Sequence, residues 1–142
     1  MNKSNNFIPN SVVLNDCKYI LRHLKLQKLK KKKILILGGN SFIATYLQAI
    51  LVLLKCEITS ISLSKPRGLF KEILKKNKIK FLQMDLTNKQ KVNKVLKRKF
   101  NFIFHCATYG QPKKWEGNES KTISLNIDLL KQILDHSVKH KS

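Results

Sequence analysis

Acidic residues are scarce in this chain. Its 142 residues include 8 aspartates and glutamates against 29 lysines and arginines, which gives a formal net charge of +21. Arginine is also scarce, because Arg22, Arg67 and Arg98 are the only three. Proteins that read nucleic acid favour arginine for its bidentate contacts with bases and phosphates. The lysine excess therefore indicates solvated surfaces, and nucleic acid is not the partner that we expect.

Cysteine is rare too, with only Cys17, Cys56 and Cys106 and no C-x-x-C pair. An odd number of widely spaced cysteines argues against a disulfide scaffold or a zinc ribbon and suits a reducing compartment. The first residues also lack the apolar core of a secretory signal peptide. We therefore expect a cytoplasmic protein.

Motifs of several enzyme classes are missing. The chain has no G-x-S-x-G nucleophile motif and no G-K-[ST] phosphate loop. His136 and His140 have the spacing of a zinc-binding helix, but Ser137 stands where such sites need a glutamate and no third ligand follows. We predict no metal site.

Charge is absent from residues 34–54, a run of 21 residues between Lys33 and Lys55. That length could span a membrane as a helix. The polar turn Gly38-Gly39-Asn40-Ser41 interrupts the run, however, and would break a helix that faces lipid. We therefore expect a strand, a turn and a helix here, in a protein that is not embedded in a membrane.

Hydrophobic periodicity predicts alternating helices and strands. An amphipathic helix with Val13, Cys17 and Leu24 on one face is expected to end in the basic run 28–33. The predicted strands are 34–37, 57–63, 79–84 and 101–107. The predicted helices that follow them are 42–54, 69–74, 92–96 with Thr87 or Asn88 as its cap, and about 120–139.

Strands that alternate with helices indicate right-handed crossovers and one parallel sheet with helices on both faces. The predicted fold class is an α/β, Rossmann-like fold, incomplete with about four strands, and preceded by the amphipathic helix. We divide the chain into an N-terminal polar segment and helix, residues 1–32, and a partial NAD(P)-binding Rossmann domain, residues 33–142.

A glycine turn joins the first predicted strand to its helix. Gly38 and Gly39 stand where the chain must turn sharply, while Ser41 and Ala44 occupy positions at which glycine is common. Such a turn lets backbone N–H groups at a helix N-terminus face a pyrophosphate. On its own, the turn could equally be an ordinary strand-to-helix connection.

Four segments in order, LILGGNSFIATYL, FLQMDLTN, FNFIFHCAT and SLNIDLL, resemble the extended short-chain dehydrogenase/reductase family. These are the NAD-dependent epimerases and dehydratases that act on nucleotide sugars. Their pattern has a T-G-G-x-G-F-I-G turn, a D-[LV]-[TR]-[DN] turn, an H-x-A-[AS] strand and an N-x-x-x-T-x-x-[LI]-[LI] helix. The resemblance covers roughly residues 12–142 and implies a dinucleotide, NAD or NADP, as cofactor.

The resemblance also implies a set of cofactor-binding residues. Those expected to line the pyrophosphate are Gly38, Gly39, Ser41, Phe42 and Ile43.

At the adenine, Asp85 would accept a hydrogen bond from the exocyclic amine and Leu86 would pack on the ring. Cys106, Ala107 and Thr108 would lie against the ribose on the nicotinamide side.

Two further residues are placed by the same resemblance. Asn126 matches the helix asparagine that ties the fourth strand to its neighbour, although a buried polar group with backbone partners would also account for it. His105 is expected to pack under the sheet and not to act in catalysis.

The chain departs from the family after the second strand. The family often has an acid there on the ribose diol, but residues 58–71 contain none. Ser64, Lys65 and Arg67 would suit a 2′-phosphate, so NADP fits as well as NAD.

A second departure concerns catalysis. The family's catalytic Ser/Thr and Tyr-x-x-x-Lys lie beyond the fourth strand and its following helix, where this chain has no tyrosine. We interpret Tyr109 as a poor substitute, on the expectation that no lysine stands at the right spacing from it. No catalytic residue is therefore predicted.

The sequence thus predicts the NAD(P)-binding portion of an epimerase, dehydratase or reductase, truncated or split and inactive alone. Cofactor binding is expected to be weak or lost in the isolated chain, and a nucleotide sugar to bind only if the missing half is supplied, for example by a separate chain. The alternatives are a non-catalytic dinucleotide-binding or interaction module, and a basic nucleic-acid-associated protein, which rests on charge alone.

Overall fold

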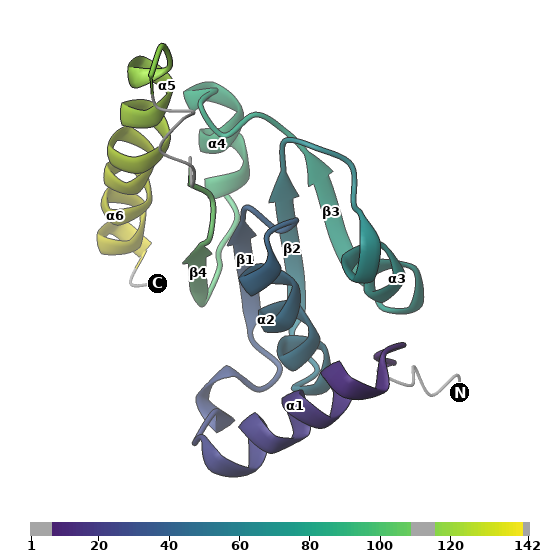
Figure 1. The fold of residues 1–142 in the computed structure, drawn as a ribbon. Helices are drawn as coiled ribbons and strands as arrows, with labels where there is room; N and C mark the ends of the chain where they lie inside the picture. Colours follow the sequence, from purple (N-terminus) through teal and green to yellow (C-terminus); the bar gives the residue numbers. More distant parts are fainter. Residues whose placement is uncertain (1–6, 109–115, 141–142) are drawn as a thin grey trace.

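A parallel four-stranded sheet in the order β3-β2-β1-β4 forms the centre of the molecule (Figure 1). The computed structural model describes residues 7–108 and 116–140. The strands are β1 (Lys33–Leu37), β2 (Glu57–Ser62), β3 (Ile79–Gln83) and β4 (Phe102–His105). In the register, Ile34 of β1 lies beside Ile58 of β2 and Phe102 of β4. The predicted Rossmann-like architecture is confirmed.

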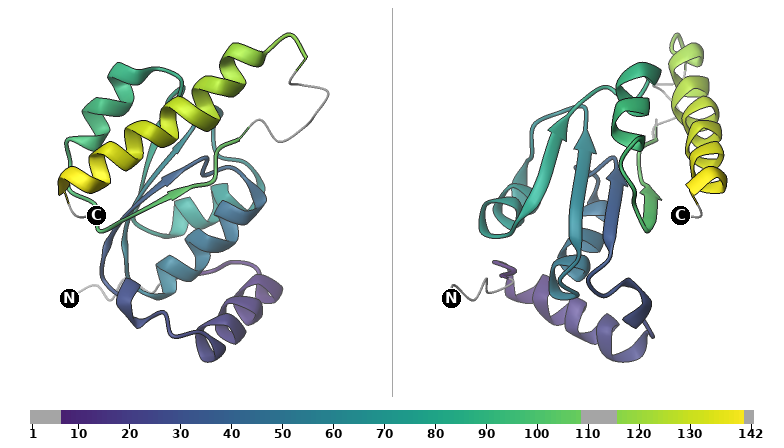
Figure 2. Two further views of the ribbon diagram at one scale, coloured as in Figure 1. Left: turned by 90° about the vertical axis from the view of Figure 1, so that its left-hand side faces the viewer. Right: turned by 180° about the vertical axis from the view of Figure 1, so that it is seen from behind.

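Helices cover both faces of the sheet, as the left view of Figure 2 shows in profile. One face carries α2 (Phe42–Leu53) and α3 (Gly68–Lys76), and the other carries α4 (Lys89–Leu96) and α6 (Leu129–His140). Alternate residues of β1 serve the two cores: Ile34 and Ile36 pack in the first, Leu35 and Leu37 in the second. This alternation follows from the period-two geometry of a strand buried on both sides.

The uncharged stretch divides into β1, the glycine turn and α2, as expected. Within residues 7–108 and 116–140, no helix has both the length and the apolar character needed to cross a membrane. The fully buried Gln48 on α2 and Ser60 on β2 belong to the polar part of the core beside the glycine turn.

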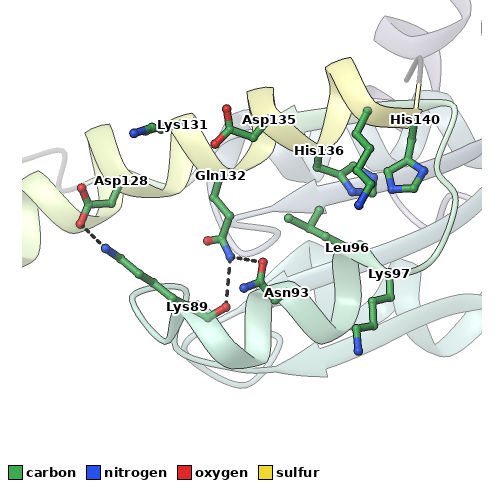
Figure 3. Close-up of a pocket in the computed structure, with 11 residues that line it drawn as sticks. Lys89, Asn93, Leu96, Lys97, Asp128, Lys131, Gln132, Asp135, His136 and His140 are labelled. Atoms are coloured by element: carbon green, nitrogen blue, oxygen red, sulfur yellow. Dashed lines mark hydrogen bonds and ion pairs between the residues drawn. The ribbon is translucent and has the colours of Figure 1, made fainter.

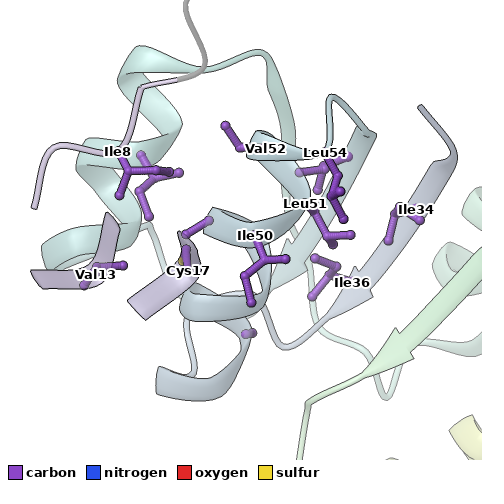
Figure 4. Close-up of a cluster of buried hydrophobic side chains, with 13 residues drawn as sticks. Ile8, Val13, Cys17, Ile34, Ile36, Ile50, Leu51, Val52 and Leu54 are labelled. Carbon is purple, nitrogen blue, oxygen red and sulfur yellow. The ribbon is translucent and has the colours of Figure 1, made fainter. Parts of the chain in front are cut away.

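The N-terminal helix α1 (Ser11–His23) forms a further layer, packed on the outside of α2. Asn10 caps it by accepting from the Val13 N–H at 3.1 Å. Val13 and Cys17 enter the same hydrophobic cluster as Ile50 of α2 (Figure 4). The amphipathic helix is therefore present and packs on the Rossmann-like unit.

The prediction that this helix ends in the basic run 28–33 is wrong. The helix ends at His23, and Leu24 already has extended backbone angles. A short 3₁₀ turn, Gln27–Leu29, follows, and Lys33 begins β1. Leu26 and Leu29 pack against the core that α1 and α2 share, so the chain turns back to bury them.

The last predicted helix contains a π-helical segment. α5 (Glu119–Ile123) leads into π-helical residues Ser124–Asp128 and then into α6. After this wider turn, Leu129 and Ile133 are buried in the same core as Val92 and Leu96 of α4. The other strands end close to the prediction: β3 is one residue shorter at its end, and β4 is one residue shorter at its start and two at its end. Asn88 is the cap of α4.

Candidate functional site

A cavity of about 790 Å³ opens at the carboxyl ends of the strands. It lies where β1 has β2 on one side and β4 on the other, the point at which the strand order reverses. Parallel α/β sheets bind ligands at such a switch point. The cavity is lined by residues at the carboxyl ends of the four strands and by two residues of the C-terminal helices. The former are Gly38, Asn40, Ser41, Ser62, Leu63, Ser64, Asp85, Leu86, Thr87, Cys106, Ala107 and Thr108, and the latter are Lys121 and Leu125.

Gly38 is required at the turn for two reasons. Its φ of +85° is a conformation that residues with a side chain rarely adopt. In addition, a Cβ at this position would lie 2.5–2.7 Å from backbone atoms of Cys106 and Ala107. The turn after β1 is therefore pressed against the end of β4, and valine at position 38 would disturb the packing of the sheet as well as any bound phosphate.

Gly39 is held by buried polar side chains that the sequence analysis missed. The Gln48 Nε2 donates to the Gly39 carbonyl at 2.9 Å and to the Ala44 carbonyl at 3.0 Å. A Cβ on Gly39 would collide with the Ser60 Oγ. The signal for Gln48 in the sequence is a polar residue on an otherwise apolar helix.

Ser41 caps α2, because its Oγ accepts from the Ala44 N–H at 3.2 Å. It also lines the cavity. The side chains of Phe42 and Ile43 are 77% and 73% exposed and are not among the cavity-lining residues. Only their backbone amides, in the first turn of α2, are in a position that suits the predicted role.

The predicted adenine residues lie together at one end of the cavity. The Asp85 Oδ1 accepts from the Thr87 N–H at 2.9 Å and from the Thr87 hydroxyl at 2.8 Å. These two hydrogen bonds fix the orientation of the Asp85 carboxylate. Neither of them uses the Oδ2 of Asp85. Leu86 is 7% exposed and packs in the core below while also lining the cavity.

The end of β4 supplies the opposite wall, with Cys106, Ala107 and Thr108 as expected. The Cys106 N–H donates to the Leu37 carbonyl at 2.8 Å, which extends the pairing of β4 with β1. Burial raises the pKa of the Cys106 thiol, so the sulfur is held in its neutral form. Burial lowers the pKa of the neighbouring His105, which is partly buried.

Of the three residues predicted for a 2′-phosphate, only Ser64 lines the cavity. Lys65 and Arg67 are exposed on the loop that follows. The structure adds Asn40, Lys121 and Leu125, which sequence reasoning missed. Asn126 lies in the π-helical segment beside Leu125 and is partly buried, and its tie to β4 stays a prediction.

The tyrosines do not complete a catalytic site among the described residues. Tyr19 is exposed on α1, and the Tyr46 hydroxyl of α2 lies 3.4 Å from the Asp16 Oδ2, so neither lines the cavity. Tyr109 is outside the described residues. The expectation that it lacks a suitably spaced lysine is wrong, because Lys113 stands four residues later.

The Tyr109–Lys113 spacing differs in context from the family motif. Tyrosine and lysine four residues apart meet on one face of a helix. Here Gly110 and Pro112 lie between them, and both disfavour a helical turn. The pair also follows β4 directly instead of the next helix.

A second hollow lies between α4 and α6 (Figure 3). The Gln132 Nε2 bridges the helices by donating to the Lys89 carbonyl at 3.1 Å and the Asn93 Oδ1 at 2.6 Å. Lys89 also pairs with Asp128 at 3.0 Å. These contacts hold the two helices together. None of them pairs a nucleophilic side chain with a general base, so they do not indicate a catalytic site. Over residues 7–108 and 116–140, no three His, Cys, Asp or Glu side chains group as a metal site.

The strand order, the glycine-bearing connection from β1 to α2 and the cavity at the switch point define a Rossmann-like α/β protein. Comparison of the sequence with models of protein families then identifies one family within this fold class. The model of the NAD dependent epimerase/dehydratase family matches residues 34–142. The chain belongs to that family.

Solved structures share the fold. A UDP-Glc/GlcNAc 4-epimerase from Campylobacter jejuni is 25% identical with a TM-score of 0.66, over 78% of this chain and 34% of that one. An epimerase from Methanothermobacter thermautotrophicus is 16% identical with a TM-score of 0.64, over 93% and 36%. The Bordetella bronchiseptica enzyme WbmF, in complex with NAD⁺ and UDP, is 16% identical with a TM-score of 0.62, over 78% and 33%.

The chain therefore spans about a third of the length of these solved proteins, whose shares are 33–36%. No curated protein sequence matches this chain.

Proposed function

We propose that this chain is the dinucleotide-binding portion of a nucleotide-sugar epimerase or dehydratase. The observation that carries the proposal is the cavity of about 790 Å³ at the switch point of the sheet, lined by Gly38, Ser41, Asp85, Leu86 and Ala107. These residues stand at family motif positions that are far apart in the sequence.

The cavity fits the parts of a dinucleotide. The first turn of α2 follows the glycine turn without an acidic residue, so its free amides suit a pyrophosphate. At one end, the Asp85 carboxylate is fixed by Thr87 for an exocyclic amine. At the other, Ala107 and Thr108 form a wall of small side chains that leaves room for a ribose.

A nicotinamide cofactor bound here would supply hydride transfer. The chain's own residues would bind and orient it: backbone amides of the turn hold the phosphates and Leu86 packs on the adenine. Cys106 is kept neutral by burial, so it adds no negative charge beside the phosphates.

Completion of the substrate site requires further polypeptide, in a longer protein or in a separate chain. Two features support this. β4 is an edge strand of the sheet. Large apolar side chains also remain exposed along the C-terminal helices, at Ile123, Ile127, Leu130, Leu134 and Val138. A nucleotide sugar would bind only in the completed protein, and cofactor binding by this chain alone would be weak.

Alkylation of cysteines tests the proposed cleft with a control inside the same molecule. Cys106 lines the cavity at the carboxyl ends of the strands, whereas Cys56 directly precedes β2, at the opposite end of the strands. Both are partly buried thiols whose pKa is raised by burial. NAD⁺ or NADP⁺ at millimolar concentration should slow the alkylation of Cys106 severalfold and leave that of Cys56 unchanged, as measured by peptide mass spectrometry.

A millimolar dissociation constant is roughly the weakest affinity of interest, so the ligand is tested at about ten times that concentration. If Cys106 is alkylated at the same rate with and without NAD⁺ or NADP⁺ at that concentration, no dinucleotide binds in this cleft. Slowing of both cysteines alike would indicate general stabilisation instead of occupancy.

A further inference from the structure

Four segments that lead from a helix into a strand lie at the end of the sheet opposite the cleft. In a parallel sheet all such segments reach the amino ends of the strands, whereas the cleft lies at the carboxyl ends. In Figure 1 this end of β1 and β2 points toward α1. The segments, each taken from the end of a helix to the start of a strand, are residues 24–33, 54–57, 75–78 and 97–101.

Positive charge is concentrated in these four segments. They contain thirteen lysines and arginines, all exposed, and a single acid, Glu57. At the other end of the sheet, residues 38–41, 63–67 and 84–88 contain two cations, Lys65 and Arg67, and one acid, Asp85. The excess of lysine is therefore not spread evenly over the molecule. We call the surface formed by the four segments the basic end.

Backbone hydrogen bonds hold segments of the basic end side by side. The Lys31 N–H donates to the Leu54 carbonyl at 3.1 Å, which joins the first segment to the second. The Lys33 N–H donates to the Asn101 Oδ1 at 2.9 Å, and the Asn101 N–H donates to the Lys33 carbonyl at 2.8 Å. These bonds join the first segment to the fourth, so the cations of three segments share one fixed surface.

Two lysines of this surface occupy strained positions. Lys31 and Lys55 have φ angles of +58° and +59°, in the left-handed region that favours glycine or asparagine. Both stand in the tight turns that bring the first two segments together. The sequence therefore carries a cation at the basic end even where the backbone favours another residue.

Exposed apolar side chains accompany the cations. Leu24 is exposed at the start of the first segment. Phe7 is exposed beside the third segment, because Asn77 accepts from the Phe7 N–H at 3.0 Å and donates to its carbonyl at 2.7 Å. The Lys76 Nζ lies 5.8 Å from the centre of the Phe7 ring. The basic end thus combines positive charge with apolar side chains that project beyond the core.

This combination discriminates between the large anionic partners of a cell. Twelve of the thirteen cations are lysine, a compact and strongly hydrated charge that needs no fixed partner geometry, whereas arginine forks suit the phosphates and bases of nucleic acid. An anionic lipid surface attracts clustered lysines through its diffuse charge. Its interface also accepts leucine and phenylalanine side chains, for which a nucleic-acid backbone has no apolar layer.

We propose that the basic end is a docking surface for anionic phospholipid membranes, with Leu24 and Phe7 entering the interface between lysines. The chain would lie on the membrane and not cross it. Because the cleft is at the opposite end of the sheet, it would face away from the lipid and stay open to solution. The inference does not depend on which ligand the cleft binds.

The first test measures sedimentation of the full chain with large vesicles. Vesicles of phosphatidylcholine with about one-third phosphatidylglycerol should bind the chain at least about tenfold more tightly than vesicles of phosphatidylcholine alone. Raising the salt from about 0.1 M to about 1 M should release most of the bound chain, because the screening length falls from about 10 Å to about 3 Å.

The second test separates the basic end from the net charge. The variant Lys28→Gln/Lys30→Gln/Lys32→Gln removes three exposed charges from the first segment and should weaken binding to anionic vesicles about tenfold or more. The matched control is Lys71→Gln/Lys91→Gln/Lys131→Gln. It removes the same charge from exposed positions near the starts of α3, α4 and α6, at the cleft end, and should weaken binding less than about threefold.

The apolar contribution has its own pair of variants. Leu24→Asn should weaken binding to anionic vesicles severalfold, while Ile127→Asn, at an equally exposed residue of the π-helical segment, should not. Folding of each variant is checked by circular dichroism. Should the first triple variant fail to fold, Lys75→Gln/Lys78→Gln/Lys99→Gln tests the other segments with the same expected loss.

Three results would overturn the proposal. Equal binding to neutral and anionic vesicles would exclude recognition of lipid charge. Equal losses in the two triple variants would show that net charge alone attracts the chain. Binding to a DNA duplex of about 20 base pairs without binding to anionic vesicles would assign the basic end to nucleic acid.

None of these results would bear on the cleft, because the vesicles and the DNA are tested without a dinucleotide. The proposed function and the docking surface can therefore fail separately.

Discussion

Ser41 shows how one residue can serve the fold at a position that corresponds to glycine in the T-G-G-x-G-F-I-G pattern that the turn resembles. Its Oγ accepts from the Ala44 N–H and so satisfies one of the free amides at the start of α2. The same residue lines the cavity, where a smaller side chain would let a phosphate approach more closely. Capping of α2 therefore requires a side chain at position 41, whereas close approach of a phosphate favours having none.

Substitutions of Ser41 should separate its effect on stability from its effect on cofactor binding. Ser41→Ala removes the cap and should lower the free energy of unfolding by about 1 kcal/mol, while Ser41→Gly should cost only a few tenths. Ser41→Gly should also bind NAD⁺ or NADP⁺ as tightly as the parent or more tightly. Urea unfolding and ligand titration measure the two effects, and a large loss of affinity in Ser41→Gly would contradict the predicted phosphate contact.

His136 is expected to make the free energy of unfolding depend on pH. Burial lowers its pKa from about 6.5, and the nearby His140 and Lys139 lower it further. The folded chain therefore favours neutral His136. As the pH falls below 6.5, this side chain becomes protonated in the unfolded chain before it does so in the folded chain, and this difference favours unfolding. Stability should be complete above that pH and fall as the pH drops toward the lowered folded pKa.

Urea unfolding between pH 7.5 and pH 5.5, roughly one unit on either side of an ordinary histidine pKa, checks this expectation. His136→Gln should reduce the loss of stability over that interval, and His23→Gln, at the exposed end of α1, should not. Part of the slope should remain in His136→Gln, since burial also lowers the pKa of His105. An unchanged slope in His136→Gln would show that this side chain does not titrate differently on folding.

At the scale of elements, α1 is attached to the rest of the fold through its apolar face, which packs on α2. Val13 is 4% exposed against α2 while its neighbour Val12 is 64% exposed. Cys17 lies in the same contact, and burial, with a smaller contribution from Asp16, raises its thiol pKa to about 11. The reactivity of this thiol therefore reports whether α1 is docked.

We expect Val13→Ala to loosen α1 by about 1–2 kcal/mol, from the loss of two buried methyl groups. Alkylation of Cys17 should then be about tenfold faster, while Val12→Ala should leave the rate unchanged. Cys106 serves as the internal reference because it follows β4, an edge strand, and lines a cavity to which no residue of α1 contributes. If Val13→Ala and Val12→Ala behave alike, α1 is not held through Val13.

Periodicity predicted the alternation of elements because the strands are apolar runs and the helices have clear apolar faces. It could not place the end of α1, because Leu24 still fits the helical spacing of Val13 and Cys17 and the basic run after it suits a helix C-terminus. Leu26 and Leu29 instead pack by turning back on the core. The π-helical segment is also invisible to a pattern search, since it inserts one residue without a special side chain.

The candidate site was predictable where backbone chemistry demands a residue type, as at Gly38. Asn40 was not predictable, because its partners are 24–25 residues away and nothing in the local pattern marks it. Gln48 stands out as a polar residue on an apolar helix, but the sequence does not show that it holds the carbonyls 4 and 9 residues before it. Phe42 and Ile43 match the family motif, but their side chains are exposed outside the cavity.

For the whole molecule, charge and apolar surface are arranged differently at the two ends of the sheet. Lysines gather where the strands begin, and Glu57 is the acid there that faces both Lys33 and Arg98, each at 3.9 Å. Such exposed pairs contribute little to stability. The cleft lies at the other end, so the high net charge need not serve the cofactor. Salt-sensitive DNA binding with little sequence preference would support the nucleic-acid alternative.

Activity is the last property of the whole molecule that can be tested. We predict that this chain alone has no epimerase, dehydratase or reductase activity, because no described tyrosine lines the cavity and because we propose that the substrate half of the cleft comes from further polypeptide. General acid–base catalysis contributes roughly 10²–10⁴ in rate, and positioning of the substrate contributes more. The assay mixes the chain with nucleotide sugars and NAD⁺ or NADP⁺ and follows reduced-cofactor absorbance and product sugars. Turnover that disappears in both Tyr109→Phe and Lys113→Met would overturn the prediction and show that the Tyr109–Lys113 pair forms a catalytic site of its own.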